Sequence, residues 1–332
     1  MRIDILTVFP EMISAALDHS IIKRAIEREL IDIRVVNLRD FTSDRHHTTD
    51  DVPYGGGGGM VMKIEPIALA LGTIAFGDAR PRPESNGEWE GKSGVSTTLS
   101  VEEAIDRLKS NRATRKVRIA LTDPRGAVFT QETARIWAKE EHLILLCGHY
   151  EGVDDRVRQF LTTDEVSIGD YILTGGELPA LIIADALTRL QNGALGDAEA
   201  TGKDTFSNHL LEHPHYTRPK EFFGMSVPEV LLSGHHAQIE NWRRWHQLTA
   251  TRERRPDLYA RIPLSSDDYK LLSGSEPAAP PDPKAIRRAA YIADEVKKAD
   301  LPSPDENLLS DHEMGTLQIP ESGQEEKNGA RL

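Results

Sequence analysis

The 332-residue chain lacks the features that mark secreted or membrane-spanning proteins. Its one cysteine, Cys147, excludes an internal disulfide and fits a reducing compartment. No apolar run approaches the roughly 20 residues of a membrane-spanning helix. The apolar stretch in MRIDILTVFP is too short for a secretory signal and has no small-residue cleavage site. We therefore expect a cytoplasmic protein without a membrane partner.

Acidic residues outnumber basic ones. The chain has 40 Lys and Arg against 53 Asp and Glu, a net charge of −13, which excludes a generally basic nucleic-acid coat. A local basic patch can still bind RNA. Hydrophobic residues at 39% and charged residues at 28% are ordinary globular values, which excludes wholesale disorder and leaves room for about two domains.

The composition changes near the carboxyl end. Residues 276–332 hold 7 of the 19 prolines and more acidic than basic residues, so we predict a disordered acidic tail with at most one short helix over 284–298. Residues 78–98 are rich in Gly, Pro and Ser and are predicted to be a surface insertion. The roles of both segments stay open.

Short apolar runs alternate with helical patterns in the first part of the chain. The runs 3–7, 31–37, 117–121 and 143–147 predict strands. Helical patterns cover 12–29, 131–141 and 178–191. This alternation predicts an α/β fold with a parallel sheet covered on both faces.

A second domain is predicted beyond residue 203. The segment GDAEATGK at 196–203 is small and polar and is interpreted as a linker between a domain at 1–195 and one at 204–275. The second domain has a helical pattern. Ser226 is expected to cap a helix entering at 227–228, and 237–254 predicts a longer basic helix.

Glycine-rich segments are the first candidates for chemistry. Five glycines in PYGGGGGM, 53–60, predict positive φ angles or a close backbone approach, although a flexible loop explains such a run equally well. The turns CGHYEG at 147–152 and SIGDYILTGGE at 167–177 each follow a predicted strand or lead into a helix. Such turns at the carboxyl ends of parallel strands are typical ligand sites. Neither has dinucleotide-site spacing.

Two further patterns allow weaker hypotheses. The segment HLLEH, 209–213, matches a zinc-protease pattern, but the following Pro214 disfavours the helix that zinc binding would need. The stretch with Trp242, Arg243, Arg244 and Trp245 fits RNA binding and, equally, a solvated helix face with its tryptophans packed inward.

Several motifs in order resemble one family. NLRDFT, TTDDVPYGGGGGM, CGHYEG, SIGDYILTGGELPA and HPHYTRP are similar to the bacterial tRNA (guanine-N1)-methyltransferases, which belong to the trefoil-knotted superfamily of S-adenosylmethionine-dependent RNA methyltransferases. The resemblance runs to about residue 272. It implies a parallel α/β domain with a carboxyl-terminal trefoil knot and a smaller helical second domain.

The resemblance also implies an activity and a site. The expected reaction moves a methyl group from S-adenosylmethionine to N1 of the guanine at tRNA position 37, in a homodimer whose active site lies at the subunit interface. Asp204 is the expected general base and Arg189 the expected stabiliser of charge on O6. Mg²⁺ is expected to assist, with ligands unknown. The residues expected to bind the cofactor are Pro124, Gly148, Tyr150, Glu151, Ile168, Gly169, Asp170, Tyr171, Ile172, Leu173, Gly175 and Gly176.

Three rival functions also fit parts of the sequence. A knotted methyltransferase acting on a different RNA base would share the cofactor turns but should lack Asp204 and the HYTRP motif. A zinc hydrolase would need His209, Glu212 and His213 as ligands. A non-catalytic RNA-binding protein would carry the basic helix without needing the two glycine turns.

Overall fold

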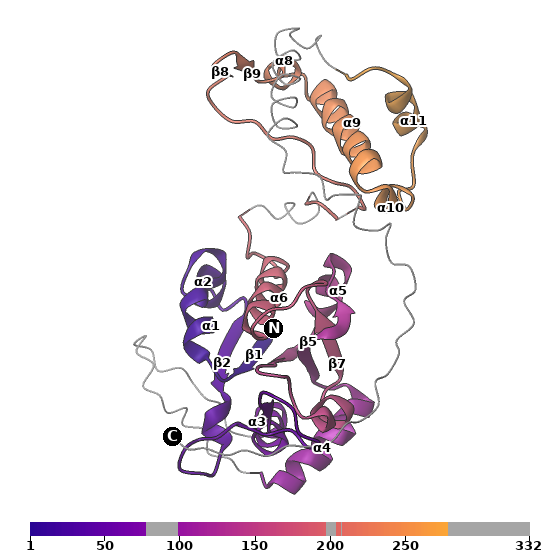
Figure 1. Cartoon of the computed structure of the whole chain (residues 1–332). Helices are drawn as coiled ribbons and strands as arrows, with labels where there is room; N and C mark the ends of the chain where they lie inside the picture. The colour runs from indigo at the N-terminus through magenta and orange to yellow at the C-terminus, as the bar shows by residue number, and fades with distance from the viewer. Residues whose placement is uncertain (78–98, 197–203, 207, 278–332) are drawn as a thin grey trace, which may run out of the picture. The chain divides into compact units, whose positions relative to one another are not determined.

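The computed structural model describes residues 1–77, 99–196, 204–206 and 208–277. These residues form two compact units: Met1–Glu212 with Gln247–Pro263, and His213–His246 with the chain from Leu264 (Figure 1). The predicted insertion at 78–98, the tail helix at 284–298 and all of the predicted linker except Gly196 lie outside the described residues. The domain boundaries predicted above stay predictions.

The first unit is built on a five-stranded sheet in which every pairing is parallel, as the sequence predicted. The strand order is β2-β1-β6-β5-β7. Its strands are β1 (Arg2–Thr7), β2 (Asp32–Asn37), β5 (Arg118–Val128), β6 (His142–Cys147) and β7 (Asp164–Ser167). The order places the carboxyl ends of β6, β5 and β7 next to one another, which matters for the site below.

Alternation of apolar side chains along the central strands creates a core on each face of the sheet. On β6, Ile144 and Leu146 belong to one buried cluster, whereas Leu143 and Leu145 belong to the other. Because successive side chains of a strand point to opposite faces, an uninterrupted apolar strand must be covered on both sides.

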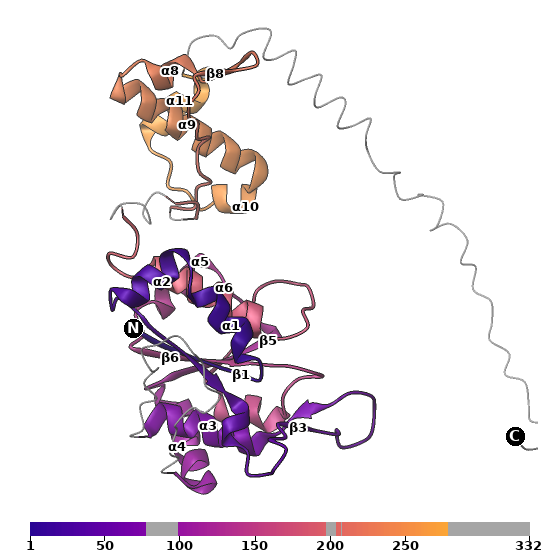
Figure 2. The same ribbon diagram turned by 90° about the vertical axis from the view of Figure 1, so that its left-hand side faces the viewer.

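Helices cover both faces (Figures 1 and 2). One face carries α1 (Pro10–Leu17), α2 (Ser20–Glu27), α5 (Gln131–Trp137) and α6 (Glu177–Arg189). The other carries α3 (Ile64–Phe76) and α4 (Val101–Thr114). The same face also holds the short helices η1 (Leu38–Phe41) and η2 (Val157–Leu161), whose apolar side chains join its core. A Ser100 capping box, in which Glu103 reciprocates, starts α4.

Some predicted helix boundaries are wrong. The pattern over 12–29 is two helices, α1 and α2, with a break at Asp18–His19 and a positive φ of 57° at Ser20. The helix predicted over 131–141 ends at Trp137. The apolar periodicity of the sequence continues past the break after α1 and past the end of α5, so it could not reveal these two boundaries.

The remaining elements are short strands and helices. Two small antiparallel ribbons pair β3 (Asp50–Asp51) with β4 (Val61–Met62) and β8 (Glu221–Phe222) with β9 (Met225–Ser226). The helices are α8 (Glu229–Leu232), α9 (His236–Arg254), α10 (Pro256–Tyr259) and α11 (Ser266–Ser273). Ser226 lies in β9 and Pro228 occupies the cap position of α8, so the predicted Ser226 cap is wrong. Among the described residues, no helix combines the length and apolarity needed to span a bilayer.

Candidate active site

A cavity of about 440 Å³ opens where β5, β6 and β7 end. Most of its lining comes from three chain segments: Leu121–Arg125 within β5, Gly148–Val153 after β6, and Val166–Gly176, except Asp170, around and after β7. Asp155 and Pro179 also line it. Strand β5 bulges between Thr122 and Ala127 where it pairs with β7, which moves the Asp123–Arg125 segment out of the sheet and to the cavity. The cavity thus occupies the usual ligand position of a parallel α/β sheet.

Glycines allow the two turns to close against each other. The Gly176 amide donates to the Gly148 carbonyl over 2.7 Å, and His149 and Gly175 form an isolated antiparallel bridge. A Cβ at Gly176 would lie 2.8 Å from Cys147 Cα and from the Gly148 amide nitrogen. The turns therefore require glycine for close backbone approach.

The structure brings the expected cofactor residues together. All of them except Asp170, which is exposed in the loop after β7, line this cavity: Pro124, Gly148, Tyr150, Glu151, Ile168, Gly169, Tyr171, Ile172, Leu173, Gly175 and Gly176. Several apolar side chains remain open to solvent, including Ile172 at 80% and Tyr171 at 54%. An apolar wall with a few polar groups and backbone amides is the usual make-up of a small-molecule site.

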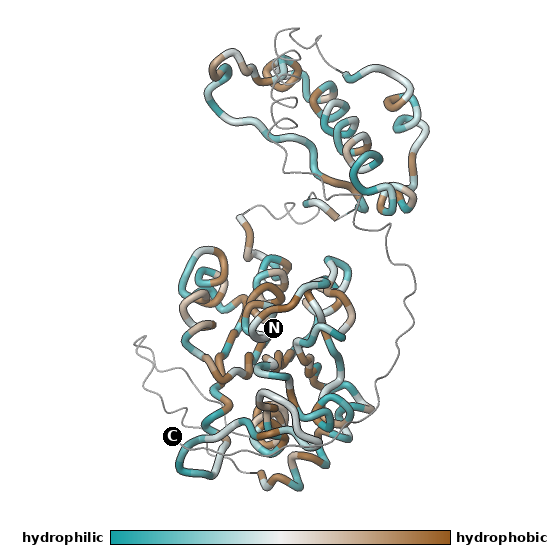
Figure 3. Tube along the Cα trace, in the orientation of Figure 1, coloured by the Kyte–Doolittle hydropathy of each residue, from teal (hydrophilic) through white to brown (hydrophobic). Residues whose placement is uncertain are grey.

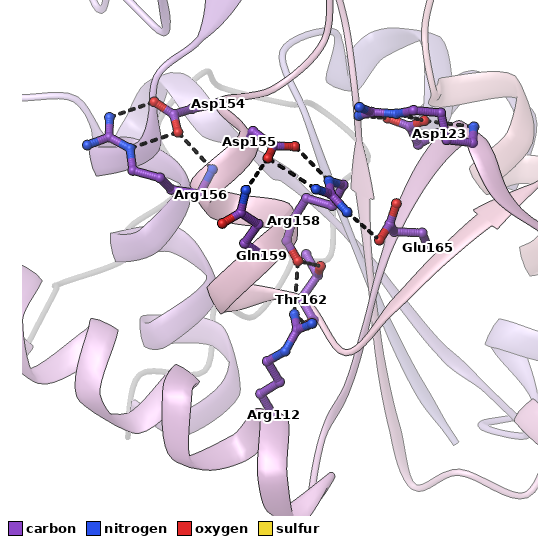
Figure 4. A network of polar contacts seen from close by, with 10 residues as sticks. Arg112, Asp123, Asp154, Asp155, Arg156, Arg158, Gln159, Thr162 and Glu165 are labelled. Carbon is purple, nitrogen blue, oxygen red and sulfur yellow. Dashed lines mark hydrogen bonds and ion pairs between the residues drawn. The ribbon is translucent and has the colours of Figure 1, made fainter.

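Charged groups at the cavity were missed by the sequence analysis. Asp123 accepts a bidentate contact from Arg125, at 2.9 Å and 2.8 Å, which lowers the pKa of Asp123. Asp155 is held by Arg158 and Gln159, whose hydrogen bonds lower the pKa of Asp155 to about 2 (Figure 4). Both carboxylates are therefore ionised at neutral pH.

The glycine run approaches the same loops. Glu151 donates its amide to the Met60 carbonyl, and Met62 donates to the Gly152 carbonyl, both over 3.0 Å. Gly59 has a φ of 84°, and a side chain there would meet Glu151. The positive φ angles predicted for this run are present at Gly55, Gly56, Gly57 and Gly59.

The expected catalytic pair is in contact but lies elsewhere in the unit. Arg189, the last residue of α6, places Nη2 2.6 Å from Asp204 Oδ2. The two side chains are 39% and 34% exposed. They line a second cavity of about 620 Å³ with Leu181, Ile182 and Phe206, and neither residue lines the first cavity. Within one chain, the pair and the expected cofactor residues are thus in separate cavities.

Local hydrogen bonds hold the segment around Asp204. The Glu212 amide donates to Thr205 Oγ1 over 3.1 Å, and the Phe206 amide donates to the Leu210 carbonyl over 2.9 Å. This segment is not helical, so His209 and His213 do not share a helical face. No cluster of three or more His, Cys, Asp or Glu able to hold a metal occurs in the described part of the chain. The zinc hypothesis loses its geometric basis.

Two side chains of the basic helix α9, Trp242 and Arg244, bind other residues of the second unit. Trp242 is buried, and its Nε1 donates to Glu276 Oε1 over 3.0 Å. Arg244 makes a bidentate contact with buried Asp268, at 2.7 Å and 2.9 Å, and lowers the pKa of Asp268 to about 2. Trp242 is therefore packed inward, as one of the two hypotheses for this helix predicted, whereas Trp245 is only half-buried.

Comparisons with known proteins agree on one group. A sequence profile described as "tRNA (Guanine-1)-methyltransferase TrmD" matches residues 1–81 and 88–261. A tRNA (guanine-N(1)-)-methyltransferase of Desulforamulus reducens is 47% identical over 272 residues, which is 82% of this chain and 94% of that protein. The enzyme of the same name from Brevibacillus brevis is 47% identical over 276 residues, 83% of this chain and 98% of that protein.

Proposed function

The chain belongs to the tRNA (guanine-1)-methyltransferase family, and from that premise we propose that it methylates N1 of the guanine at tRNA position 37. S-adenosylmethionine is the proposed methyl donor. The observation that carries the proposal is the cavity at the ends of β5, β6 and β7, where the residues that the family resemblance assigns to the cofactor converge. We also propose that the chain carries the family's trefoil knot and acts in the cytoplasm.

The first cavity fits such a cofactor. Its volume of about 440 Å³ falls in the range of roughly 300–1,000 Å³ typical of small-molecule sites. The absence of a side chain at Gly148 and Gly176 leaves room beside the backbone. A Cβ added at either glycine would lie within 3.3 Å of a backbone atom of another residue and would narrow or fill that room. When bound, S-adenosylmethionine supplies an activated methyl group on a sulfonium. The apolar Tyr171, Ile172 and Leu173 would cover it from water.

The chemistry at guanine requires an acid–base partner and an anion stabiliser. N1 of guanine carries a proton at neutral pH, so a base must remove it while negative charge develops towards O6. N1–H and O6 are neighbouring groups on one edge of the base. Asp204 and Arg189, 2.6 Å apart, present a carboxylate and a guanidinium side by side, which suits the two tasks.

Separation of the two cavities supports a composite site in a homodimer. Asp204 and Arg189 do not line the cofactor cavity of their own chain. A cyclic dimer would allow the pair of one subunit to serve the cavity of the other. We propose this arrangement, with the anticodon stem-loop of tRNA bound between the subunits.

Mg²⁺ is a further proposed component. It would lower the pKa of the guanine and so ease deprotonation. Mg²⁺ usually takes only one or two carboxylates and fills its shell with substrate oxygens and water, so it needs no dedicated cluster of protein ligands. We assign no ligands.

A base-substitution experiment tests the proposed function. Purified protein is incubated with labelled S-adenosylmethionine and two tRNA transcripts that differ only in guanine or adenine at position 37. We expect transfer to the guanine transcript and background with the adenine one. Equal transfer to both would assign the enzyme to a different base.

A further inference from the structure

A hairpin in the second unit displays apolar side chains to solvent. Phe222 in β8, Phe223 in the turn and Met225 in β9 are 55%, 76% and 52% exposed. The hydropathy colouring shows this hairpin as an apolar tip next to a hydrophilic segment (Figure 3). Large exposed apolar side chains gathered on one short element indicate an interaction surface.

The hairpin geometry presents these side chains together. Phe222 and Met225 are directly opposite in the antiparallel register, so both side chains lie on one face of the ribbon. The Phe222 and Phe223 rings pack edge to face with centroids 4.7 Å apart. The Val227 amide donates to the Lys220 carbonyl over 2.9 Å and extends the ladder by one pair.

The turn places an aromatic residue where the backbone disfavours it. Phe223 and Gly224 have φ angles of 49° and 81°, the two positive values of a type I′ turn. Asn or Asp is preferred at the first of these positions, and a bulky side chain there is uncommon. Phe223 therefore occupies the tip at a local conformational cost. This cost indicates that the side chain serves binding rather than the stability of the fold.

The charge beside the tip suits a polyanion. Arg218 and Lys220 are exposed on the irregular segment that leads into the hairpin, and Glu221 is the one carboxylate in the sequence from 213 to 226. Arg243 and Arg244 of α9 are less available, because Arg244 is bound to Asp268 and Arg243 to Glu240.

We propose that the hairpin tip is a stacking platform for an unpaired nucleobase of the RNA substrate. Phe222 and Phe223 supply ring surfaces, and Arg218 and Lys220 contact the adjoining phosphates. Aromatic rings interleaved with cations are the usual means of holding single-stranded RNA. The inference rests on the proposed function, because an anticodon loop offers unpaired bases.

The test uses the full-length protein and an anticodon stem-loop RNA, with the dissociation constant measured by fluorescence anisotropy over a salt series. Phe223→Asn removes the ring and installs a residue that the type I′ turn prefers, so the hairpin itself is kept. Stacking contributes enough that its loss should raise Kd roughly tenfold. Phe223→Trp should retain affinity.

Salt dependence separates stacking from charge. Phe223→Asn should leave the salt slope unchanged, whereas Lys220→Ala should reduce it by roughly 0.7 to 0.9. Tyr269→Ala is the matched control, since Tyr269 is 62% exposed on α11 of the same unit but outside the hairpin. Its Kd should equal that of the unmodified protein.

Three outcomes would overturn the inference. If the unmodified protein methylates tRNA and Phe223→Asn keeps its Kd, the platform is absent while the proposed function stands. If Phe223→Asn instead changes the molar mass in light scattering, a second copy of the chain occupies the tip. If the unmodified protein does not methylate tRNA at all, the proposed function fails and the platform loses its ligand.

Discussion

At the scale of single residues, the account depends on the contact between Arg189 and Asp204. The two side chains meet at 2.6 Å and are about one-third exposed. Both therefore remain accessible to a base that enters the second cavity. In the proposed mechanism, a carboxylate already held next to a guanidinium would need little rearrangement to take the N1 proton while the guanidinium faces O6.

We predict that Asp204→Asn reduces methyl transfer about 10²- to 10⁴-fold, because the amide cannot accept the N1 proton. Binding of S-adenosylmethionine should stay nearly unchanged, since Asp204 does not line the first cavity. Single-turnover kinetics and isothermal titration measure the two effects. Asp267→Asn, which changes an exposed carboxylate on α11, is the control. A rate above one-tenth of normal for Asp204→Asn would remove the assignment.

The glycines of the two turns could be predicted as site residues from the sequence, whereas the charged residues beside them in the cavity could not. Gly148 and Gly176 follow from motif position after a strand and before a helix. Asp123, Arg125 and Asp155 line the cavity as well, and no spacing rule marks them. In the sequence they are only charged residues near a turn, and such residues are common on protein surfaces.

At the scale of elements, short continuous apolar runs made the strands predictable, because strands covered on both faces are buried at successive residues. Each strand predicted over 3–7, 31–37, 117–121 and 143–147 overlaps an observed strand. Breaks in regular structure were harder to predict. The turn at Asp18–His19 and the β8–β9 hairpin depend on backbone conformations, such as the positive φ of Ser20 and Phe223, that side-chain periodicity does not encode.

For helix α9 we predict that Arg244→Ala acts on stability. Asp268 is buried, and Arg244 is the largest cause of its pKa of about 2, below the ordinary 3.8. A depressed carboxyl pKa stabilises the fold above the unfolded pKa and loses this effect as pH falls towards 2. Arg244 is one-third exposed, which limits the cost to about 1–2 kcal/mol at pH 7.

Urea titrations from pH 7 to pH 2 would measure that cost. The difference between Arg244→Ala and the unmodified protein should be constant at neutral pH and shrink between about pH 4 and pH 2. A difference that persists unchanged at pH 2 would show that packing, rather than the ion pair, is lost.

The end of the second unit gives another prediction. Glu276 Oε1 accepts from Trp242 Nε1 over 3.0 Å and lies 2.8 Å from His246 Nε2. Glu276 falls within the predicted tail at 276–332. The stability of a protein truncated before Glu276 should therefore differ from that of a protein truncated after residue 277. We expect deletion of 278–332 to leave stability and kcat/KM unchanged, and deletion of 276–332 to cost about 1 kcal/mol.

Thermal and urea unfolding of the two truncated proteins would measure the difference, and Glu276→Gln in the full chain is the matched variant. Equal stability of both truncations would mean that the Glu276 contacts contribute nothing. A large loss on removing 278–332 would instead make the tail part of the fold.

At the scale of the whole molecule, the proposed composite site predicts complementation. Gly148→Val should block the cofactor cavity, since a Cβ there lies 3.3 Å from the Thr122 carbonyl oxygen and the branched side chain adds bulk. Gly196→Val, at a site with no atom near its Cβ, is the control for the substitution. Asp204→Asn should remove the base. Each variant alone should be inactive.

Mixed and reassembled in equal amounts, the two variants should recover about a quarter of the normal rate. Half of the dimers are then heterodimers, and one of their two sites combines the intact cavity with the intact base. If cofactor and base act within one chain, every site keeps a defect and the mixture stays inactive. Activity of the mixture therefore separates a site shared between subunits from a site within one.

The most direct test of the central claim is mass spectrometry of nucleosides and mapped fragments from a guanine-37 tRNA transcript incubated with the protein and S-adenosylmethionine. The account predicts one new product, N1-methylguanosine, confined to the fragment that holds position 37. Asp204→Asn should leave that fragment unmodified in the same time. A methyl group on another atom or another nucleotide, or full modification by Asp204→Asn, would contradict the account.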